Sequence, residues 1–520
     1  MTTTTPRTSD LSDDPRRDRP APDDAPTAIH GARGWSRRTW LLLVVLCGAL
    51  FLDSLDISMV GVALPSIGSD LGMTASGLQW IVSGYVLGYG GLLLLGGRSA
   101  DLLGRRSVFL IAVAVFGIAS VASAFLSNEL ALVALRFVKG VAAAFTVPAG
   151  LSIITTTFAE GPARNRALSI YTVCGASGFS LGLVVGGLLT ELSWRATFLL
   201  PGPVALVLLL VGWRVVPAAT RTAARLSDFD LVGAVTSTTG LLLFVVGVVE
   251  APTLGWTSPV VLGLLVASLG LGALFVRTER RHATPLVRLG ILRAPHIVHA
   301  NVSGAVMAGC YFSFQFLLTL YLQNSLGWSP LTMALGFLPA GLLVVASATS
   351  MDKVLERVRT QVLIAVGLAS FLVAYVLFLR VDPGLGYAAL LLPTMLLLGV
   401  GFALTFPSIN AQATSGIHDD EQGLASGLVN TSVQIGGAVV LAVVSAILAA
   451  AGTADGPARP GALIPGMLGS LQVIVAITAV GVLASFGMLL IGRRSQVVLE
   501  TEGLGVAEPL ASRQEACTSN

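Results

Sequence analysis

Long apolar segments follow one another along most of this chain. Fourteen of them are long enough to form a helix that crosses a bilayer, which takes about 20 residues. A single run of this kind is also typical of a buried helix in a soluble core. Fourteen in succession, joined by short connections, instead predict an integral membrane protein of helices only. The predicted spans are 40–62, 78–97, 107–126, 130–151, 167–190, 196–216, 231–250, 258–277, 296–322, 331–350, 361–380, 384–409, 423–450 and 465–491.

The composition agrees with this class, because 54% of the residues are hydrophobic and only 11% are charged. A soluble protein of this size needs more polar surface. The polar ends, 1–34 and 495–520, are expected to be disordered cytoplasmic tails, and the first has no apolar core of a signal peptide. The four cysteines show no spacing typical of a disulfide framework or a metal site. The small net charge of +3 gives no indication of nucleic-acid binding.

The positive charges predict the orientation. With the N-terminus inside, the outer loops hold only Arg195, Arg380 and Arg459 of the 31 Lys and Arg residues. Cytoplasmic segments of membrane proteins are enriched in Lys and Arg, and an even number of spans leaves both termini on the same side. We therefore expect a multi-pass protein of the cell (cytoplasmic) membrane with both termini in the cytoplasm.

A faint internal repeat divides the spans into two halves. Pro148 and Gly178 recur as Pro407 and Gly436 in similar surroundings. Duplicated halves with a site between them are a recurrent plan of transporters. The expected fold is all-α, with 14 transmembrane helices in two six-helix halves and an inserted helix pair. The expected division is a tail (1–34), an N-terminal half (35–216), an inserted two-helix linker (217–295), a C-terminal half (296–494) and a tail (495–520).

Two predicted spans carry charges inside the apolar layer. Asp53 and Asp56 lie three residues apart in the first span, and Arg136 and Lys139 lie three apart in the fourth, so each pair shares one helical face. A charge at mid-membrane costs about 2.5–3.5 kcal/mol. The acids must therefore be paired, protonated or exposed to water inside the bundle, and each of these options is typical of a transporter.

The depths of these four residues predict how they pair. At ~1.5 Å per residue from the outer span ends, Asp56 and Arg136 both lie about 9 Å deep, and Asp53 and Lys139 both about 13.5 Å deep. We predict that Asp56 faces Arg136 and that Asp53 faces Lys139, the additional acid and base compensating each other. The alternative is independent snorkelling of each side chain, which suits Asp poorly at this depth.

Two further segments carry recognisable patterns. Between the second and third spans, glycines permit a tight turn, a carboxylate can cap a helix, and arginines can bridge to neighbouring helix ends. Such a cluster can latch one conformation, and a plain positive turn is the alternative. Glycines of the fifth span permit close helix approach, with plain packing or a bending role as alternatives. The residues are Gly97, Asp101, Gly104, Arg105 and Arg106 in the turn, and Gly178, Gly182, Gly186 and Gly187 in the span.

These segments resemble motifs of the major facilitator superfamily, and the first span is similar to that of its fourteen-span drug:proton antiporters. The turn at 97–106 matches GxxxDxxGRR, and 55–65 resembles LDxTIVNVALP. The segment 136–140 is similar to RxxQG, 178–187 to GxxxGPxxGG, and 194–198 to WRxxF. The departures are Ser58 for Thr, Gly61 for Asn, Lys139 for Gln, Leu183 for Pro, and Asp53 as an additional acid.

The resemblance implies proton-coupled efflux of lipophilic or aromatic small molecules, such as drugs or antibiotics. Proton coupling is expected at Asp56, Asp53, Arg136 and Lys139, where a proton and a substrate compete for one face. The proton gradient is the expected energy source, and no cofactor, metal or nucleic acid is expected to bind. We expect a monomer in the lipid bilayer.

Substrate contacts are expected from aromatic and amide side chains. The ninth span is rich in aromatic residues, which suit a large apolar compound. Gln315 and Gln434 come first, because an amide in lipid needs a partner. Lipid-facing or core positions are the alternative for each aromatic ring. The further candidates are Tyr311, Phe316, Asn430 and Tyr85.

Other functional classes differ from efflux in the features that they would require. A proton-coupled uptake symporter would share the fold, and only the direction of movement under a pH gradient separates the two. A membrane enzyme would need a catalytic cluster, but the five histidines are scattered, with no nucleophile, metal or phosphate motif beside them. A pure receptor would not need titratable groups in the first span.

Overall fold

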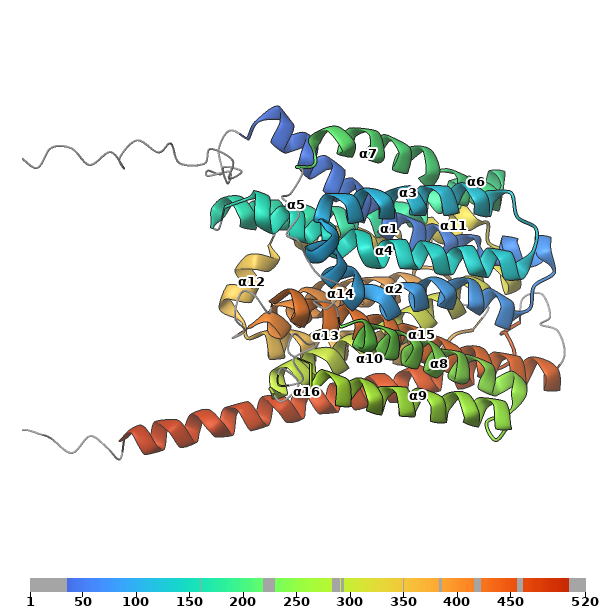
Figure 1. The fold of residues 1–520 in the computed structure, drawn as a ribbon. Helices are drawn as coiled ribbons and strands as arrows, with labels where there is room; N and C mark the ends of the chain where they lie inside the picture. Colours follow the sequence, from blue (N-terminus) through green and yellow to red (C-terminus); the bar gives the residue numbers. More distant parts are fainter. Residues whose placement is uncertain are drawn as a thin grey trace, which may run out of the picture.

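The computed structural model describes residues 35–159, 161–217, 230–282, 290, 294–348, 350–382, 386–415, 422–455 and 462–504. These residues form a bundle of long helices, with no strand in the described ranges (Figure 1). The predicted tail 1–34 and the end of the chain beyond 504 lie outside the described residues.

Seven helices make up the first six spans. Several of them start at a polar side chain that accepts a hydrogen bond from the first turn, as Ser36 does for the helix that begins at Arg37 and Asn128 for the helix that begins at Glu129. The sixth span is broken, because Pro201 has no amide hydrogen to continue the preceding helix. The helices are α1 (Arg37–Leu71), α2 (Ala75–Leu103), α3 (Arg105–Ala124), α4 (Glu129–Thr157), α5 (Pro162–Leu192), α6 (Trp194–Leu199) and α7 (Pro201–Val215).

The remaining helices supply eight further spans. A short helix, α12, follows the tenth span, and a π-helical turn, η3, ends the ninth. The inserted pair is α8 (Leu231–Leu254) and α9 (Pro259–Glu279). The last spans comprise α10 (Pro295–Leu320), η3 (Tyr321–Ser325), α11 (Pro330–Ala348), α12 (Met351–Arg357), α13 (Thr360–Phe378), α14 (Leu391–Thr414), α15 (Gln422–Asp455) and α16 (Met467–Leu504).

The predicted membrane helices are confirmed. Thirteen helical segments of the described chain are long and apolar enough to cross a membrane, and α2, with 29 residues, covers the predicted span 78–97. Large apolar side chains such as Ile118, Val266 and Leu483 are exposed on the outside of the bundle, where lipid would solvate them. Helix α16 continues past the predicted span end at 491 to Leu504, and no proline or glycine interrupts its polar part between Arg493 and Gly503.

In the described chain, the two most extensive helix contacts between the first and last six spans are those of α2 with α15 and of α5 with α11. The inserted helices pack on each other, and α8 also contacts α2 and α15 through a small apolar core that includes Val86, Val245 and Ala442. Thr238 of α8 donates a hydrogen bond to the Gly91 carbonyl of α2 at 2.8 Å. Helix α8 of the inserted pair therefore lies beside the contact between α2 and α15.

The two halves are joined at one end of the bundle. We call this the far end, where Gly72 connects α1 to α2, and the opposite end, where α1 begins, the terminal end. One apolar core combines Val62 and Ile67 of α1 with Leu317 of α10. Gln323 of η3 donates to the Val62 carbonyl at 3.0 Å. A second large core contains only residues between 35 and 216, so this conformation is closed at the far end.

The glycines of α5 allow α1 to approach closely. A Cβ on Gly178 would lie 2.4 Å from the Phe51 carbonyl oxygen, and one on Gly182 would lie 2.6 Å from the Leu55 carbonyl oxygen. Backbone atoms cannot move aside as flexible side-chain ends can, so α1 and α5 can pack this closely only with glycine at these positions. The predicted close approach is confirmed at this helix pair.

Replacing Gly182 by alanine is therefore expected to push α1 away from α5. We expect the Gly182→Ala protein to lose about 1–3 kcal/mol of stability, the usual effect of overpacking. The melting temperature of the purified protein in detergent measures this loss. Gly263→Ala on α9 is the matched control, because a Cβ there meets nothing within 4 Å. Equal melting temperatures for the two variants would contradict the close packing.

Candidate functional site

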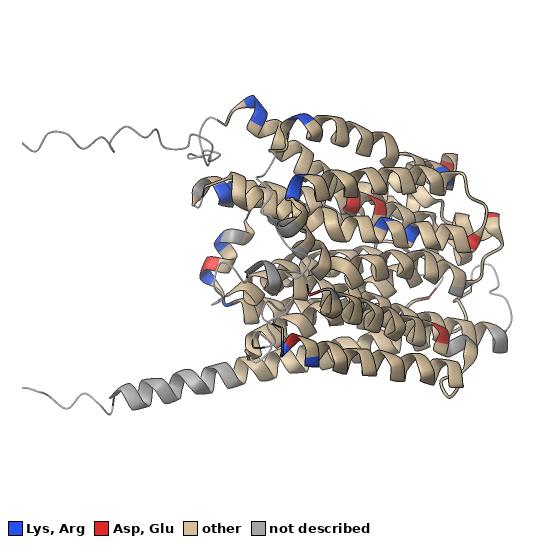
Figure 2. Ribbon diagram, viewed as in Figure 1, with Lys and Arg blue, Asp and Glu red and all other residues tan. Residues whose placement is uncertain are grey.

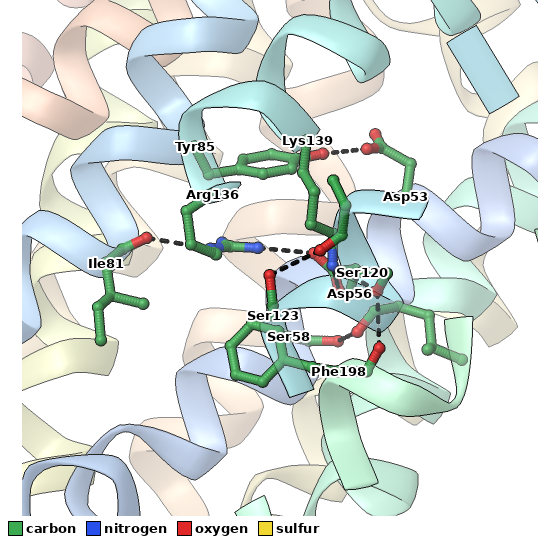
Figure 3. Close-up of polar contacts among 12 residues, drawn as sticks. Asp53, Asp56, Ser58, Ile81, Tyr85, Ser120, Ser123, Arg136, Lys139 and Phe198 are labelled. Atoms are coloured by element: carbon green, nitrogen blue, oxygen red, sulfur yellow. Dashed lines mark hydrogen bonds and ion pairs between the residues drawn. The ribbon is translucent and has the colours of Figure 1, made fainter. Parts of the chain in front are cut away.

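A buried carboxylate lies between two cations in the middle of the bundle. Asp56 of α1 is completely buried. Arg136 of α4 donates from Nη1 to one carboxylate oxygen of Asp56 at 2.6 Å, and Lys139 of α4 donates from Nζ to the other oxygen (Figure 3). The predicted contact between Asp56 and Arg136 is confirmed. Figure 2 shows this group of charges in the middle of the bundle, while most other Lys and Arg gather at the terminal end.

The two cations have further partners on neighbouring helices. Arg136 Nε donates to the Ile81 carbonyl of α2 at 3.0 Å. Lys139 Nζ donates to Ser120 Oγ of α3 at 2.9 Å, and Ser120 in turn donates to the Phe198 carbonyl of α6 at 2.8 Å. The ion cluster therefore fixes α1 and α4 against three other elements of the first half. Ser120 was not identified from the sequence, because a single serine in a span gives no specific signal.

Asp53 has a different partner from the one predicted. Its carboxylate accepts a hydrogen bond from the Tyr85 hydroxyl of α2, and the predicted pair of Asp53 with Lys139 is wrong (Figure 3). The prediction compared the depths of residues on helices taken as perpendicular to the membrane. The long, flexible Lys139 side chain instead reaches one helical turn along α1 to Asp56. The Tyr85 ring also lies 4.5 Å from the Arg136 guanidinium, so one side chain contacts both an acid and a cation.

Burying the charges of this cluster costs free energy unless each charge is paired. A charge buried in a span is tolerated when it is paired and its remaining hydrogen-bonding groups are satisfied. Asp56 satisfies this with two donors, and the aromatic rings of Phe116 and Phe198 lie 4.8 and 5.5 Å from Lys139 Nζ. The arrangement holds a fixed anion and two fixed cations away from water, beside a second acid.

The turn between α2 and α3 has the predicted geometry in its described part. Gly104 adopts a φ of 94°, a conformation that favours glycine. Arg106 Nη2 donates to the Trp213 carbonyl near the end of α7 at 2.5 Å, as expected for an arginine that bridges to a helix end. Gly97 lies in α2 and Arg105 begins α3, whereas the side chain of Asp101 lies outside the described residues. The role as a latch stays a prediction.

Aromatic rings from both halves meet at Tyr311 of α10. The ring centre of Phe179, on α5 of the first half, lies 6.3 Å from that of Tyr311. Phe402 of α14 lies 5.5 Å away, and Phe371 of α13 lies 6.1 Å away. Tyr311, Phe179 and Phe402 are half-buried. Phe179 and Phe402 were missed in the sequence, because isolated phenylalanines in apolar spans resemble packing residues.

The other predicted substrate residues lie in different surroundings. Gln315 is half-buried, has no hydrogen bond within the described chain, and its Nε2 lies 4.0 Å from where a Cβ on Gly61 would be. Asn430 donates to the carbonyl of its own helix at Ser426, at 2.9 Å. The remaining three are buried in this conformation: Gln434 against Gly90, Phe316 in the shared core, and Tyr85 beside the ion cluster.

Sequence comparisons relate the chain to known proteins along most of its length. A profile of the Major Facilitator Superfamily matches residues 46–441. The puromycin resistance protein pur8 of Streptomyces alboniger is 36% identical over 500 residues, 93% of this chain and 98% of that protein. The cephamycin export protein CmcT of Amycolatopsis lactamdurans is 35% identical, over 83% of this chain and 90% of that protein. The multidrug efflux pump LfrA of Mycolicibacterium smegmatis is 32% identical, over 82% and 84%.

Solved structures with the same fold are more distant in sequence. The POT family transporter PepTSo has a TM-score of 0.63 at 15% identity, covering 89% of this chain and 99% of that one. The nucleoside transporter NupG has a TM-score of 0.60 at 12% identity, covering 87% and 99%. At these identities the likeness establishes the arrangement of helices alone.

Removing the Asp56 charge is expected to destabilise the protein. Asp56→Asn leaves Arg136 and Lys139 buried without their counter-ion, which typically costs about 3–5 kcal/mol. The melting temperature in detergent should fall accordingly. Asp70→Asn on the same helix is the control, because the ion pair of Asp70 with Arg195 at 2.8 Å is exposed and contributes little. If both variants melt alike, the buried cluster does not stabilise the fold.

Proposed function

The chain belongs to the major facilitator superfamily, and we propose on that premise that it exports lipophilic aromatic molecules in exchange for protons. Export would proceed across the cell membrane, driven by the proton gradient without a further cofactor. The observation that carries the proposal is the group of ionisable side chains buried in the middle of α1 and α4. A group of this kind is costly in a membrane and is typical of a proton or substrate pathway.

The relatives support the export direction. They are similar over most of this chain, and their names include resistance to puromycin, export of cephamycin and multidrug efflux. These names differ in compound, so they favour a class of antibiotic-like small molecules over one compound. We propose the terminal end as the cytoplasmic end, because Lys and Arg gather there. The closed far end would then be the outer side.

The aromatic cluster around Tyr311 supports the substrate class. Half-buried rings from both halves offer flat apolar faces, and Gln315 adds an amide that makes no hydrogen bond to the described residues. Because Phe179 and Tyr311 belong to different halves, movement of one half against the other would change the contacts of a compound bound between them. Residues 35–216 and the spans from 296 onward are proposed as the two moving bodies.

Direction of transport distinguishes export from uptake. In inside-out vesicles with an acidic interior, we expect ethidium and puromycin to accumulate in the interior, because protons leaving the vesicle drive the exchange. A protonophore should abolish the accumulation, and vesicles without the protein are the background. An uptake symporter would instead deplete the vesicles of both probes as the protons leave, and that result would overturn the proposal.

Truncating the aromatic cluster should weaken substrate binding. Tyr311→Ala and Phe402→Ala are expected to raise the half-saturating ethidium concentration about tenfold, which corresponds to about 1.4 kcal/mol. The same vesicle assay measures this change. Phe486→Ala is the matched control, since Phe486 on α16 is 48% exposed on the outside of the bundle. Unchanged half-saturation in the two cluster variants would place the substrate elsewhere.

A further inference from the structure

The hydrogen-bond partners of the two acids of α1 differ in whether they can also accept a hydrogen bond. Both oxygens of Asp56 accept hydrogen bonds from charged groups, one from Arg136 and one from Lys139. A guanidinium and an ammonium are donors only and have no acceptor. A proton added to Asp56 would therefore face a donor, and one charge-assisted hydrogen bond would be lost.

The partner of Asp53 is a hydroxyl group. Tyr85 donates to the carboxylate, and a phenolic oxygen can also accept a hydrogen bond. When Asp53 binds a proton, the new O–H can donate to the Tyr85 oxygen, or Tyr85 can keep donating to the other oxygen. The contact therefore survives in both protonation states of Asp53.

Other ionisable groups surround Asp53, from its own helix and from three neighbouring helices. They are Asp56 on its own helix, Tyr85 and Tyr89 on α2, Arg136 and Lys139 on α4, and Tyr171 on α5. Among the groups that carry full charges, two acids and two cations balance when Asp53 is ionised. Protonation of Asp53 leaves one positive charge in excess.

We propose that Asp53 is the carboxyl group that takes up and releases the transported proton, while Asp56 stays ionised as the counter-ion of Arg136 and Lys139. This inference rests on the proposed proton exchange. The proton comes from water, adds to a carboxylate oxygen of Asp53 and returns to water on the other side. Tyr85 is a positioning residue, which holds Asp53 in place through both states.

The division of roles also indicates how proton and substrate exclude each other. Asp53 with its proton leaves the site with net positive charge, which repels a lipophilic cation nearby. Release of the proton restores neutrality and removes that repulsion. Direct contact between the substrate and Asp53 is then unnecessary for coupling.

Infrared spectroscopy identifies the acid that binds the proton. The probe is the proton itself. The purified protein in lipid is measured in alkaline and in acidic buffer. The difference between the two spectra contains the C=O stretch of each carboxyl group that becomes protonated. Asp53→Glu should shift one component in frequency, and Asp53→Asn should remove it. Asp56→Glu, which keeps the charge between the two cations, should leave that component in place, as should the exposed control Asp70→Asn.

Tyr85→Phe tests the positioning role. Loss of the phenol should shift the frequency of the Asp53 component and the midpoint of its pH titration, which a purely structural role for Tyr85 would not do. A component that moves in Asp56→Glu and persists in Asp53→Asn overturns the proposal. So does a wild-type spectrum in which no component depends on Asp53. None of these measurements uses a substrate, so they are independent of the direction and identity of the transported compound.

Discussion

The buried contact of Asp56 with Arg136 and Lys139 is the interaction on which the first half of this structure depends. It places a carboxylate and two cations where water is excluded, so each charge must keep its partner. The same cations reach the Ile81 carbonyl of α2 and the Ser120 hydroxyl of α3. One ion cluster therefore sets the relative positions of α1, α2, α3 and α4.

The packing of α1 on α5 completes this arrangement. Gly178 and Gly182 bring the two helices close enough for backbone contact, which leaves the opposite face of α1 directed at α4. Phe179 follows directly after Gly178 and reaches Tyr311 of the second half. The helix that supports the acids thus also carries a ring of the aromatic cluster. A shift of α5 would therefore move both the helix that carries the acids and the ring that contacts Tyr311.

The far end and the inserted helices constrain how the halves can move. The shared core and the hydrogen bond from Gln323 to the Val62 carbonyl join the halves at the far end. Helix α8 lies against α2 and α15, and its Glu250 accepts a hydrogen bond from Trp80 of α2 at 3.1 Å. An opening of the far end must break the first set of contacts, whereas α8 can follow α2 through its own hydrogen bonds.

Four features could be predicted from the amino-acid sequence alone: the helical membrane fold, the spans, the close approach of α5 and the contact of Asp56 with Arg136. These follow from hydrophobic length, glycine spacing and the cost of an unpaired charge, which are local properties. Three other contacts could be identified only in the packed bundle: Lys139 with Asp56, Tyr85 with Asp53, and Phe179 with Tyr311. Those contacts depend on helix tilt and on how far a flexible side chain reaches between helices. Residue spacing along one helix carries no information about either.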